Sequence, residues 1–344
     1  MTDVTFLERA AERIDQLASL DVAARGVIHN LYRWARAQAG EPLCMKAAKL
    51  LLERVGEGDV VFIATGWPDR PHISPLIAET DGPPGAAILA RAILVGLRAV
   101  PVILIEPSLV AGMARVLEAT GLRALSPEEA KAAVSSTAPI SAGAVLPFPV
   151  DRDEAKDRAR ELVEGYRPAA AIAVEKGGMN DKGFVHTSRG DETTEHMAKV
   201  DYLFQEAGRR GIATIGIGDG GNEIGMGVIA EDIRQHVPFG STGKDPAKGG
   251  MAPSTITDVL VASSISNWGA YGVAACLALL LERPEVFHDS EMEARIHRVG
   301  ADASFIDGIT GKVEPGADGL RSEVHEAYVT VMGEAIQQSL ARRR

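Results

Sequence analysis

Short apolar runs, many of them β-branched, alternate along this chain with longer helical patterns. The first such run, residues 60–64 (VVFIA), follows Asp59 and ends at Thr65-Gly66, as a buried parallel strand does when it enters a loop. The expected strands cover residues 60–64, 100–105, 143–148, 169–174, 212–217 and 259–263. The helices expected among them cover residues 85–97, 109–120, 153–166, 195–210 and 269–281.

Strands that alternate with helices form parallel sheets joined by right-handed crossovers. We therefore predict an α/β fold with a mainly parallel, doubly wound sheet flanked by helices. Residues 1–57 show helical spacing and no strand, so we expect an N-terminal helical segment packed on a main α/β domain of residues 58–344. A helical C-terminus is expected from Asp289 onward. Apolar residues make up 46% and aromatics 5%, so the core must be mostly aliphatic.

The overall charge and the cysteines exclude several classes of protein. A formal net charge of −11 and the absence of a basic stripe argue against a nucleic-acid partner. Cys44 and Cys276 stand alone in apolar helical contexts, which predicts buried free thiols and favours a reducing compartment. The first residues do not resemble a secretory signal, and the longest apolar helical stretch is too short for a membrane span. We expect a cytoplasmic protein without a membrane partner; a homo-oligomer is compatible with the sequence.

The most informative candidate site is the glycine-rich segment 216–227, which directly follows an expected strand. Ligands of doubly wound sheets bind beyond the carboxyl ends of the strands. The segment combines the glycines Gly218, Gly220 and Gly221 with the polar residues Asp219, Asn222 and Glu223. Glycines let backbone N–H groups approach a ligand, and a following helix N-terminus favours an anion. The alternative is a tight turn in which Asp219 or Asn222 only caps the helix.

Further candidates follow the other expected strands. They are Thr65 and Gly66, the segment Thr80, Asp81 and Gly82, the charged residue Glu175, and the segment Ser266, Asn267 and Trp268. Thr80, Asp81, Ser266 or Asn267 could serve only as helix caps, whereas Trp268 could form the wall of a pocket. Residues 238–253, rich in glycine and proline, could form a mobile lid or a plain surface loop.

The chain lacks the motifs of several common kinds of site. No phosphate-binding P-loop, no G-x-S-x-G nucleophile turn and no histidine or cysteine cluster with zinc spacing occurs in the sequence. The candidate residues therefore form a site rich in carboxylate, amide and hydroxyl oxygens, and the sequence requires no cofactor for it. Asp219 and Glu223 could bind a hard cation such as Mg²⁺ or Mn²⁺.

Several of these segments resemble the D-glutamate cyclase C-terminal-domain family. The resemblance rests on Thr65-Gly66, residues 80–86, residues 216–227 and residues 266–271, and extends from Asp21-Arg25-Gly26 to the Asp307-Gly308 and Asp318-Gly319 pairs. It implies a lyase that converts D-glutamate to 5-oxo-D-proline with loss of water. The segment from Lys176 to Gly190 departs from the family pattern, so a related amino acid or carboxylate stays open as the small-molecule substrate.

Lactam formation requires a base for the amine, activation of the γ-carboxyl group and a folded substrate. The catalytic candidates are Asp219, Glu223, Asp81 and Glu175, with their roles left unassigned. Two alternatives stay open. One is a phosphate- or nucleotide-dependent enzyme that uses the glycine-rich segment as an anion site, and the other is a non-catalytic amino-acid-binding module.

Overall fold

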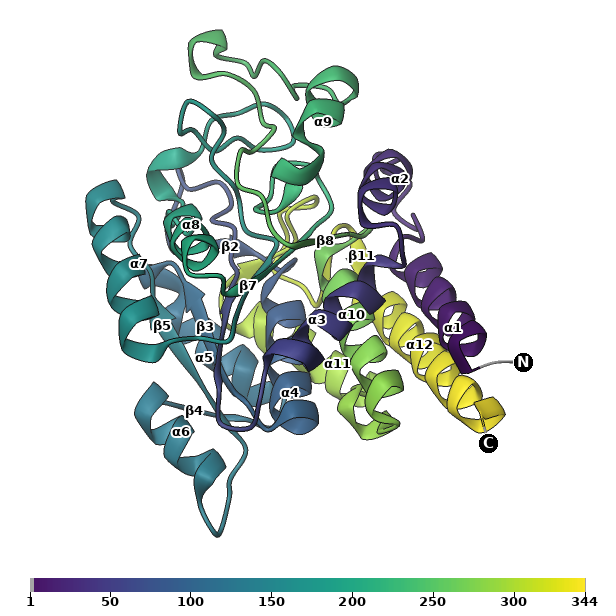
Figure 1. The fold of residues 1–344 in the computed structure, drawn as a ribbon. Helices are drawn as coiled ribbons and strands as arrows, with labels where there is room; N and C mark the ends of the chain where they lie inside the picture. The colour runs from purple at the N-terminus through teal and green to yellow at the C-terminus, as the bar shows by residue number, and fades with distance from the viewer. Residues whose placement is uncertain (1–2, 344) are drawn as a thin grey trace.

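The computed structural model describes residues 3–343 and shows a seven-stranded parallel sheet with helices on both faces (Figure 1). The strands are β1 (Val60–Ala64), β3 (Val100–Ile105), β4 (Arg123–Leu125), β5 (Ala142–Pro147), β6 (Ala170–Val174), β7 (Ala213–Gly218) and β8 (Val259–Ala262). Their order across the sheet is β4-β5-β3-β1-β6-β7-β8. The doubly wound α/β fold expected from the sequence is confirmed.

The central strand β1 shows why the sequence forms this sheet. All five of its residues are buried, and Phe62 pairs with Val102 of β3 and Ala171 of β6. Both faces of a parallel sheet are covered by helices, so its strands are apolar throughout and do not alternate with polar residues.

The chain reverses its direction across the sheet between β1 and β6. From β1 the chain passes through β3 to the edge strand β4 and then adds β5 between these two strands. It next crosses to the opposite side of β1 at β6. The loops after β1 and β6 therefore flank a topological switch point, which is where open α/β sheets bind ligands.

Two helical layers cover the sheet. The longer helices are α1 (Asp3–Ala18), α2 (Ile28–Ala39), α3 (Leu43–Arg54), α4 (Pro83–Leu97), α5 (Val110–Ala119), α6 (Pro127–Ser135), α7 (Arg152–Tyr166), α8 (Asp201–Arg209), α9 (Ala230–His236), α10 (Ser266–Leu281), α11 (Ser290–Asp302) and α12 (Ser322–Arg343). Helices α3, α4, α5 and α10 contact the sheet on one side, with α1, α11 and α12 packed outside them; α6, α7 and α8 form the other layer. Among residues 3–343, no helix is long and apolar enough to cross a membrane.

Helix α10 forms the core of the thicker layer. Every residue from Ser266 to Leu279 is buried, because α1, α3, α4 and α12 surround the helix. An all-round apolar helix is stable only in such a position. Cys44 of α3 and Cys276 of α10 are free and buried, as expected, and burial raises the pKa of both thiols.

The sequence-based boundaries are wrong at one helix. The helix expected at residues 195–210 begins only at Asp201, as α8. The preceding backbone is held by other elements: the Ala198 N–H donates to the Glu106 carboxylate at 2.8 Å, and the Lys199 N–H donates to the Pro149 carbonyl at 3.0 Å. These long-range bonds replace the helical hydrogen bonds that local spacing suggested.

Several short elements were missed. Strand β4 has only three residues at the sheet edge, and α6 follows it with a capping box between Ser126 and Glu129 that the sequence does display. Two small pairs lie outside the main sheet: β2 (Ala78–Glu79) with β9 (Phe305–Ile306), and β10 (Gly316–Ala317) with β11 (Leu320–Arg321). Two-residue strands carry no recognisable periodicity.

Residues 238–253 form a loop that contains a short 3₁₀ helix, Pro246–Lys248. The loop packs against residues 184–192: Lys244 forms an ion pair with Asp191 at 2.7 Å, and the Lys244 N–H donates to the Gly190 carbonyl at 2.9 Å. The loop therefore supports a neighbouring segment.

Candidate active site

Carboxylates from three different loops meet beyond the carboxyl ends of the strands. Glu175 follows β6, Asp219 follows β7, and Asp81 follows the short strand β2. One oxygen of each lies within 4.8 Å of the others, and all three side chains are buried. Because parallel strands all end at the same edge, residues far apart in sequence converge there.

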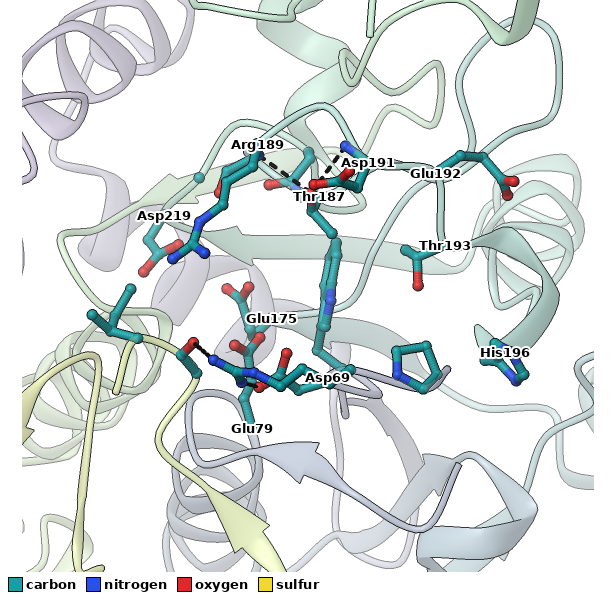
Figure 2. Close-up of a pocket in the computed structure, with 18 of the residues that line it drawn as sticks. Asp69, Glu79, Glu175, Thr187, Arg189, Asp191, Glu192, Thr193, His196 and Asp219 are labelled. Atoms are coloured by element: carbon teal, nitrogen blue, oxygen red, sulfur yellow. Dashed lines mark hydrogen bonds and ion pairs between the residues drawn. The ribbon is translucent and has the colours of Figure 1, made fainter. Parts of the chain in front are cut away.

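A pocket of about 610 Å³ opens above this cluster (Figure 2). Of the residues expected at the site, Glu175, Asp219, Gly220 and Asn222 line the pocket. The other expected residues lie behind its lining: Thr65, Gly66, Thr80, Asp81, Gly82, Gly218, Gly221, Glu223, Ser266, Asn267 and Trp268. Four of the expected residues therefore line the pocket, and the others do not.

Arg25 is the main positive charge on the floor of the pocket. Its guanidinium donates to Asp219 at 2.7 Å and to Asp318 at 2.5 Å. The loop before α2 delivers Arg25, because Asp21 accepts hydrogen bonds from the N–H groups of Arg25 and Gly26 at 2.9 and 2.6 Å. The charge of Asp219 raises the pKa of Arg25, so the guanidinium remains charged. Residues near both ends of the chain therefore complete the floor.

Asp81 and Asn267 cap each other's helices. The Asp81 carboxylate accepts the N–H groups of Ser266 and Asn267 at 2.9 and 2.8 Å, at the start of α10. In return, the Asn267 side-chain oxygen accepts the N–H groups of Gly82 and Gly85 at 3.0 and 2.7 Å, at the start of α4. Asp81 is therefore both a helix cap and a member of the acidic cluster, so the alternative of capping is realised at this position.

Glu223 turns back onto its own loop. Its two oxygens accept the N–H groups of Asp219 and Gly220 (3.1 and 2.6 Å) and of Gly221 and Asn222 (2.9 and 3.0 Å). The backbone donors that we expected to hold a ligand anion are thus occupied by an internal carboxylate. The Asn222 side chain, in turn, donates to the His186 carbonyl at 2.8 Å.

Glu175 points into the pocket from an unusual backbone conformation. Its φ is +47°, and its carboxylate accepts the Ser266 hydroxyl at 2.5 Å. Gly82, with φ +101°, lies so close that a Cβ there would come within 2.8 Å of Glu175 Cβ and of Thr65 Oγ1. Gly82 therefore allows the close approach of the two loops without contacting the pocket.

Burial raises the pKa of most carboxyl groups in this cluster. The pKa of Asp81 rises to about 8 and that of Glu223 to about 7, through burial first and the charge of Asp219 second. Burial also raises the pKa of Glu79, Glu175 and Asp318 well above the usual range, and neighbouring carboxylates add to the effect. The raised pKa values favour the protonated forms of these groups, so the site is suited to acid as well as base chemistry.

Trp268 does not form a pocket wall. It is 1% exposed and stacks on Tyr328 of α12, with ring centroids 3.8 Å apart. Its indole N–H donates to Nδ1 of His325 at 3.0 Å. The residue is part of the packing between α10 and α12, because its position on the helix directs it away from the site.

Several pocket residues were missed by the sequence-based choice of candidates. They are Arg25, Asp69, Arg70, Glu79, Arg189, His196 and Asp318. Signals were present for two of them, since Arg25 and Asp318 lie in the segments that mark the ends of the family resemblance. Of the others, Glu79 ends the short strand β2, and the rest lie in segments whose course depends on tertiary contacts.

The donor set also indicates where a cation would bind. Asp81, Glu175 and Asp219 are close enough to hold one ion between them, and oxygen ligands suit Mg²⁺ or Mn²⁺. Both oxygens of Glu223 are bound by backbone N–H groups, and Glu223 does not belong to the group of three, so it does not fit this set.

A doubly wound α/β protein with a buried carboxyl cluster at its switch point is the class that this fold and site define. The chain belongs to the D-glutamate cyclase-like family, whose C-terminal region it matches over residues 14–333. It is also similar to the human protein "D-glutamate cyclase, mitochondrial", with 33% identity over 110 residues. That alignment covers 32% of this chain and 17% of the human protein.

Proposed function

We propose that this chain cyclises D-glutamate, or a closely related amino acid, to the lactam with loss of water, which for D-glutamate yields 5-oxo-D-proline. One observation carries the proposal: two carboxyl groups in different states face one pocket. Burial raises the pKa of Glu175 well above its usual range, whereas Asp219 forms an ion pair with Arg25 at 2.7 Å. Membership of the D-glutamate cyclase-like family supports the same reaction class.

The proposed roles follow from these two states. Asp219 accepts a proton from the substrate ammonium, and Glu175 donates a proton to an oxygen of the γ-carboxylate, so that the neutral amine attacks the γ-carbon. The second proton leaving nitrogen returns Glu175 to its protonated form. Asp219 then gives its proton to the departing hydroxyl group, which leaves as water. Two protons move from nitrogen to oxygen, and both side chains end in their starting states.

The charge of the pocket favours an amine over a phosphate. Asp219, Glu175, Glu79 and Asp318 all line it, and the N–H groups of the glycine-rich loop are already bound by Glu223. The ion-paired carboxylate of Asp219 would repel a phosphate and attract an ammonium group. Because its backbone N–H groups are occupied, the glycine-rich segment does not offer the anion site that a phosphate- or nucleotide-dependent enzyme would need there.

A second candidate role for the carboxylates is to bind Mg²⁺ or Mn²⁺, favoured by the 4.8 Å grouping of Asp81, Glu175 and Asp219. Such an ion would polarise the γ-carboxyl group. The guanidinium of Arg25, which lies 2.7 Å from Asp219, opposes a second positive charge at the same place. We therefore expect turnover without added metal.

The test is an assay of the purified protein with D-glutamate, L-glutamate, D-aspartate and D-glutamine, with products identified by mass spectrometry. Each substrate is assayed with a chelator, with Mg²⁺ and with Mn²⁺, and the Glu175→Gln variant is the inactive control. Lactam formation that survives the chelator supports the acid–base proposal. Turnover that requires a metal favours the metal-bound alternative, and stabilisation by an amino acid without turnover favours a binding module.

A further inference from the structure

Three arginines line the pocket, and two of them are already engaged. Arg25 is bound by Asp219 and Asp318, and Arg70 is paired with Asp69 and lies 3.4 Å from the Gly308 carbonyl. The guanidinium of Arg189, by contrast, makes no hydrogen bond or ion pair within residues 3–343, although it borders the same pocket. An unpaired guanidinium facing buried carboxyl groups is a free binding group for an anion.

Arg189 is directed toward the floor of the pocket. Figure 2 shows its side chain extending from the loop toward Asp219 and Glu175. Arg189 is an exposed residue at the mouth of the pocket, whereas both carboxyl groups are buried beneath it. The pocket thus has the ion-paired carboxylate of Asp219 on its floor and a guanidinium at its mouth, which suits the ammonium and the carboxylate of an amino acid.

The backbone around Arg189 is held in one geometry. Thr187 and Asp191 close a tight turn through an N–H to carbonyl bond of 2.8 Å, and His186 pairs with Glu192 at its base. Gly190 adopts φ +77°, and a Cβ there would come within 2.7 Å of the Phe239 ring. The loop of residues 238–253 packs on this turn through Phe239 and through the ion pair of Lys244 with Asp191. The backbone position of Arg189 is therefore set by contacts within the protein.

We propose that Arg189 binds the α-carboxylate of the substrate and so makes a free α-carboxylate a requirement of the site. This inference rests on the proposed function, in which the amine and the γ-carboxyl group must both lie at Asp219 and Glu175. The carboxylate that does not react then points toward the mouth, where Arg189 is the one pocket arginine among the described residues that is not engaged. A guanidinium binds a carboxylate through two parallel hydrogen bonds.

The experiment compares Arg189→Gln with the wild type on two ligands. D-Glutamate carries the α-carboxylate; 4-aminobutanoate has the same chain and amine but lacks it. We expect Arg189→Gln to weaken D-glutamate binding and to raise its KM about 10- to 100-fold, since a hydrogen-bonded charge pair is lost. The kcat for D-glutamate and the Kd for 4-aminobutanoate should stay within about twofold of the wild-type values. Arg189→Lys should fall between the wild type and Arg189→Gln.

Arg160→Gln, an exposed arginine of α7, is the matched control and should change neither ligand. Equal KM values for D-glutamate in the wild type and in Arg189→Gln would overturn the inference, as would an equal loss of affinity for both ligands. If the wild type does not turn over D-glutamate, the proposed function fails separately. Arg189 is then judged on the amino acid that most stabilises the protein and on its decarboxylated amine. The inference is rejected if Arg189→Gln weakens the binding of the amino acid and of its decarboxylated amine equally. It is also rejected if no amino acid stabilises the protein.

Discussion

Asp219 is the residue on which the charges of the site converge. It lies between the guanidinium of Arg25 and the carboxyl groups of Asp81 and Glu175, and it is 3% exposed. Its negative charge contributes to the raised pKa of several neighbouring acids. A neutral side chain at this position would remove the proposed base and also alter the protonation of its neighbours.

We expect Asp219→Asn to keep the fold and to lower kcat about 10²- to 10⁴-fold, the usual effect of losing a proton-transfer group. The fold should persist because the amide is nearly isosteric with the carboxyl group and because Asp318 still pairs with Arg25. Steady-state kinetics and a thermal melt check both statements. Asp157→Asn, on the exposed face of α7, is the control. Wild-type turnover by a folded Asp219→Asn protein would place the chemistry on another residue.

At the scale of elements, helix α10 positions the site, and contacts with other segments hold its first two turns. Asp81 binds its N-terminus, while Trp268 and Tyr271 donate to His325 and to Glu293, at 3.0 Å each. Glu293 also contacts His288 and His297 at 2.9 Å each, and these neighbours lower its pKa against the opposing effect of burial. The buried network fixes the rotation of α10 relative to α11 and α12.

The hydrogen bonds by which Asn267 and Asp81 cap α4 and α10 can be tested through their contribution to the free energy of unfolding. Asn267→Ala leaves the Gly85 N–H buried without an acceptor, which costs about 1–3 kcal/mol, whereas the Gly82 N–H keeps the Asp81 carboxylate at 3.0 Å. Ser126→Ala removes the surface cap of α6 and should cost about 1 kcal/mol. Urea unfolding measures both free energies. Equal losses in the two variants would mean that water replaces the Asn267 oxygen and that the caps do not stabilise the contact between the helices.

At the scale of the whole molecule, the two ends of the chain meet at one acidic site. Arg25 precedes α2, and Asp318 lies in the β10–β11 turn before α12. The acids of the cluster are part of the formal net charge of −11, and folding brings them together in a buried site. Burial raises their pKa values, so the stability of the folded state should depend on pH.

We expect the free energy of unfolding to fall as the pH rises from 6.5 to about 7.5. Asp81 and Glu223 have pKa values near 8 and 7 in the folded state against 3.8 and 4.5 ordinarily, so the folded state binds more protons in this range. Below pH 6.5 the lowered pKa of His325, about 4, contributes the opposite slope, and Lys199, whose pKa falls to about 8, does so at higher pH.

Urea unfolding at several pH values measures this slope. Glu175→Gln should reduce it, because that variant removes one of the carboxyl groups whose pKa burial raises. A free energy of unfolding that is constant or that rises between pH 6.5 and about 7.5 would contradict the expected protonation of the cluster.

Local sequence was sufficient for six of the seven strands of the main sheet and insufficient for the edge strand β4 and for some surrounding segments. Strands such as residues 60–64 and 100–105 were predicted at their observed bounds, because a buried parallel strand is an uninterrupted apolar run. The start of α8 was misplaced by six residues, because Glu106 and Pro149 hold the preceding backbone. Contacts between distant segments do not leave a periodic pattern in either segment.

For the site, the sequence by itself determined which loops meet and which acids they carry. Residues that follow parallel strands reach one edge of the sheet, and this placed Asp219 and Glu175 together from their order in the chain. Only the tertiary structure decided which side chains face the pocket. Glu223 binds its own loop, Trp268 packs on α12, and Arg25 arrives from a segment almost two hundred residues away. The direction of a side chain depends on the partners that satisfy its charge or cover its apolar surface, and those partners are brought to it by folding.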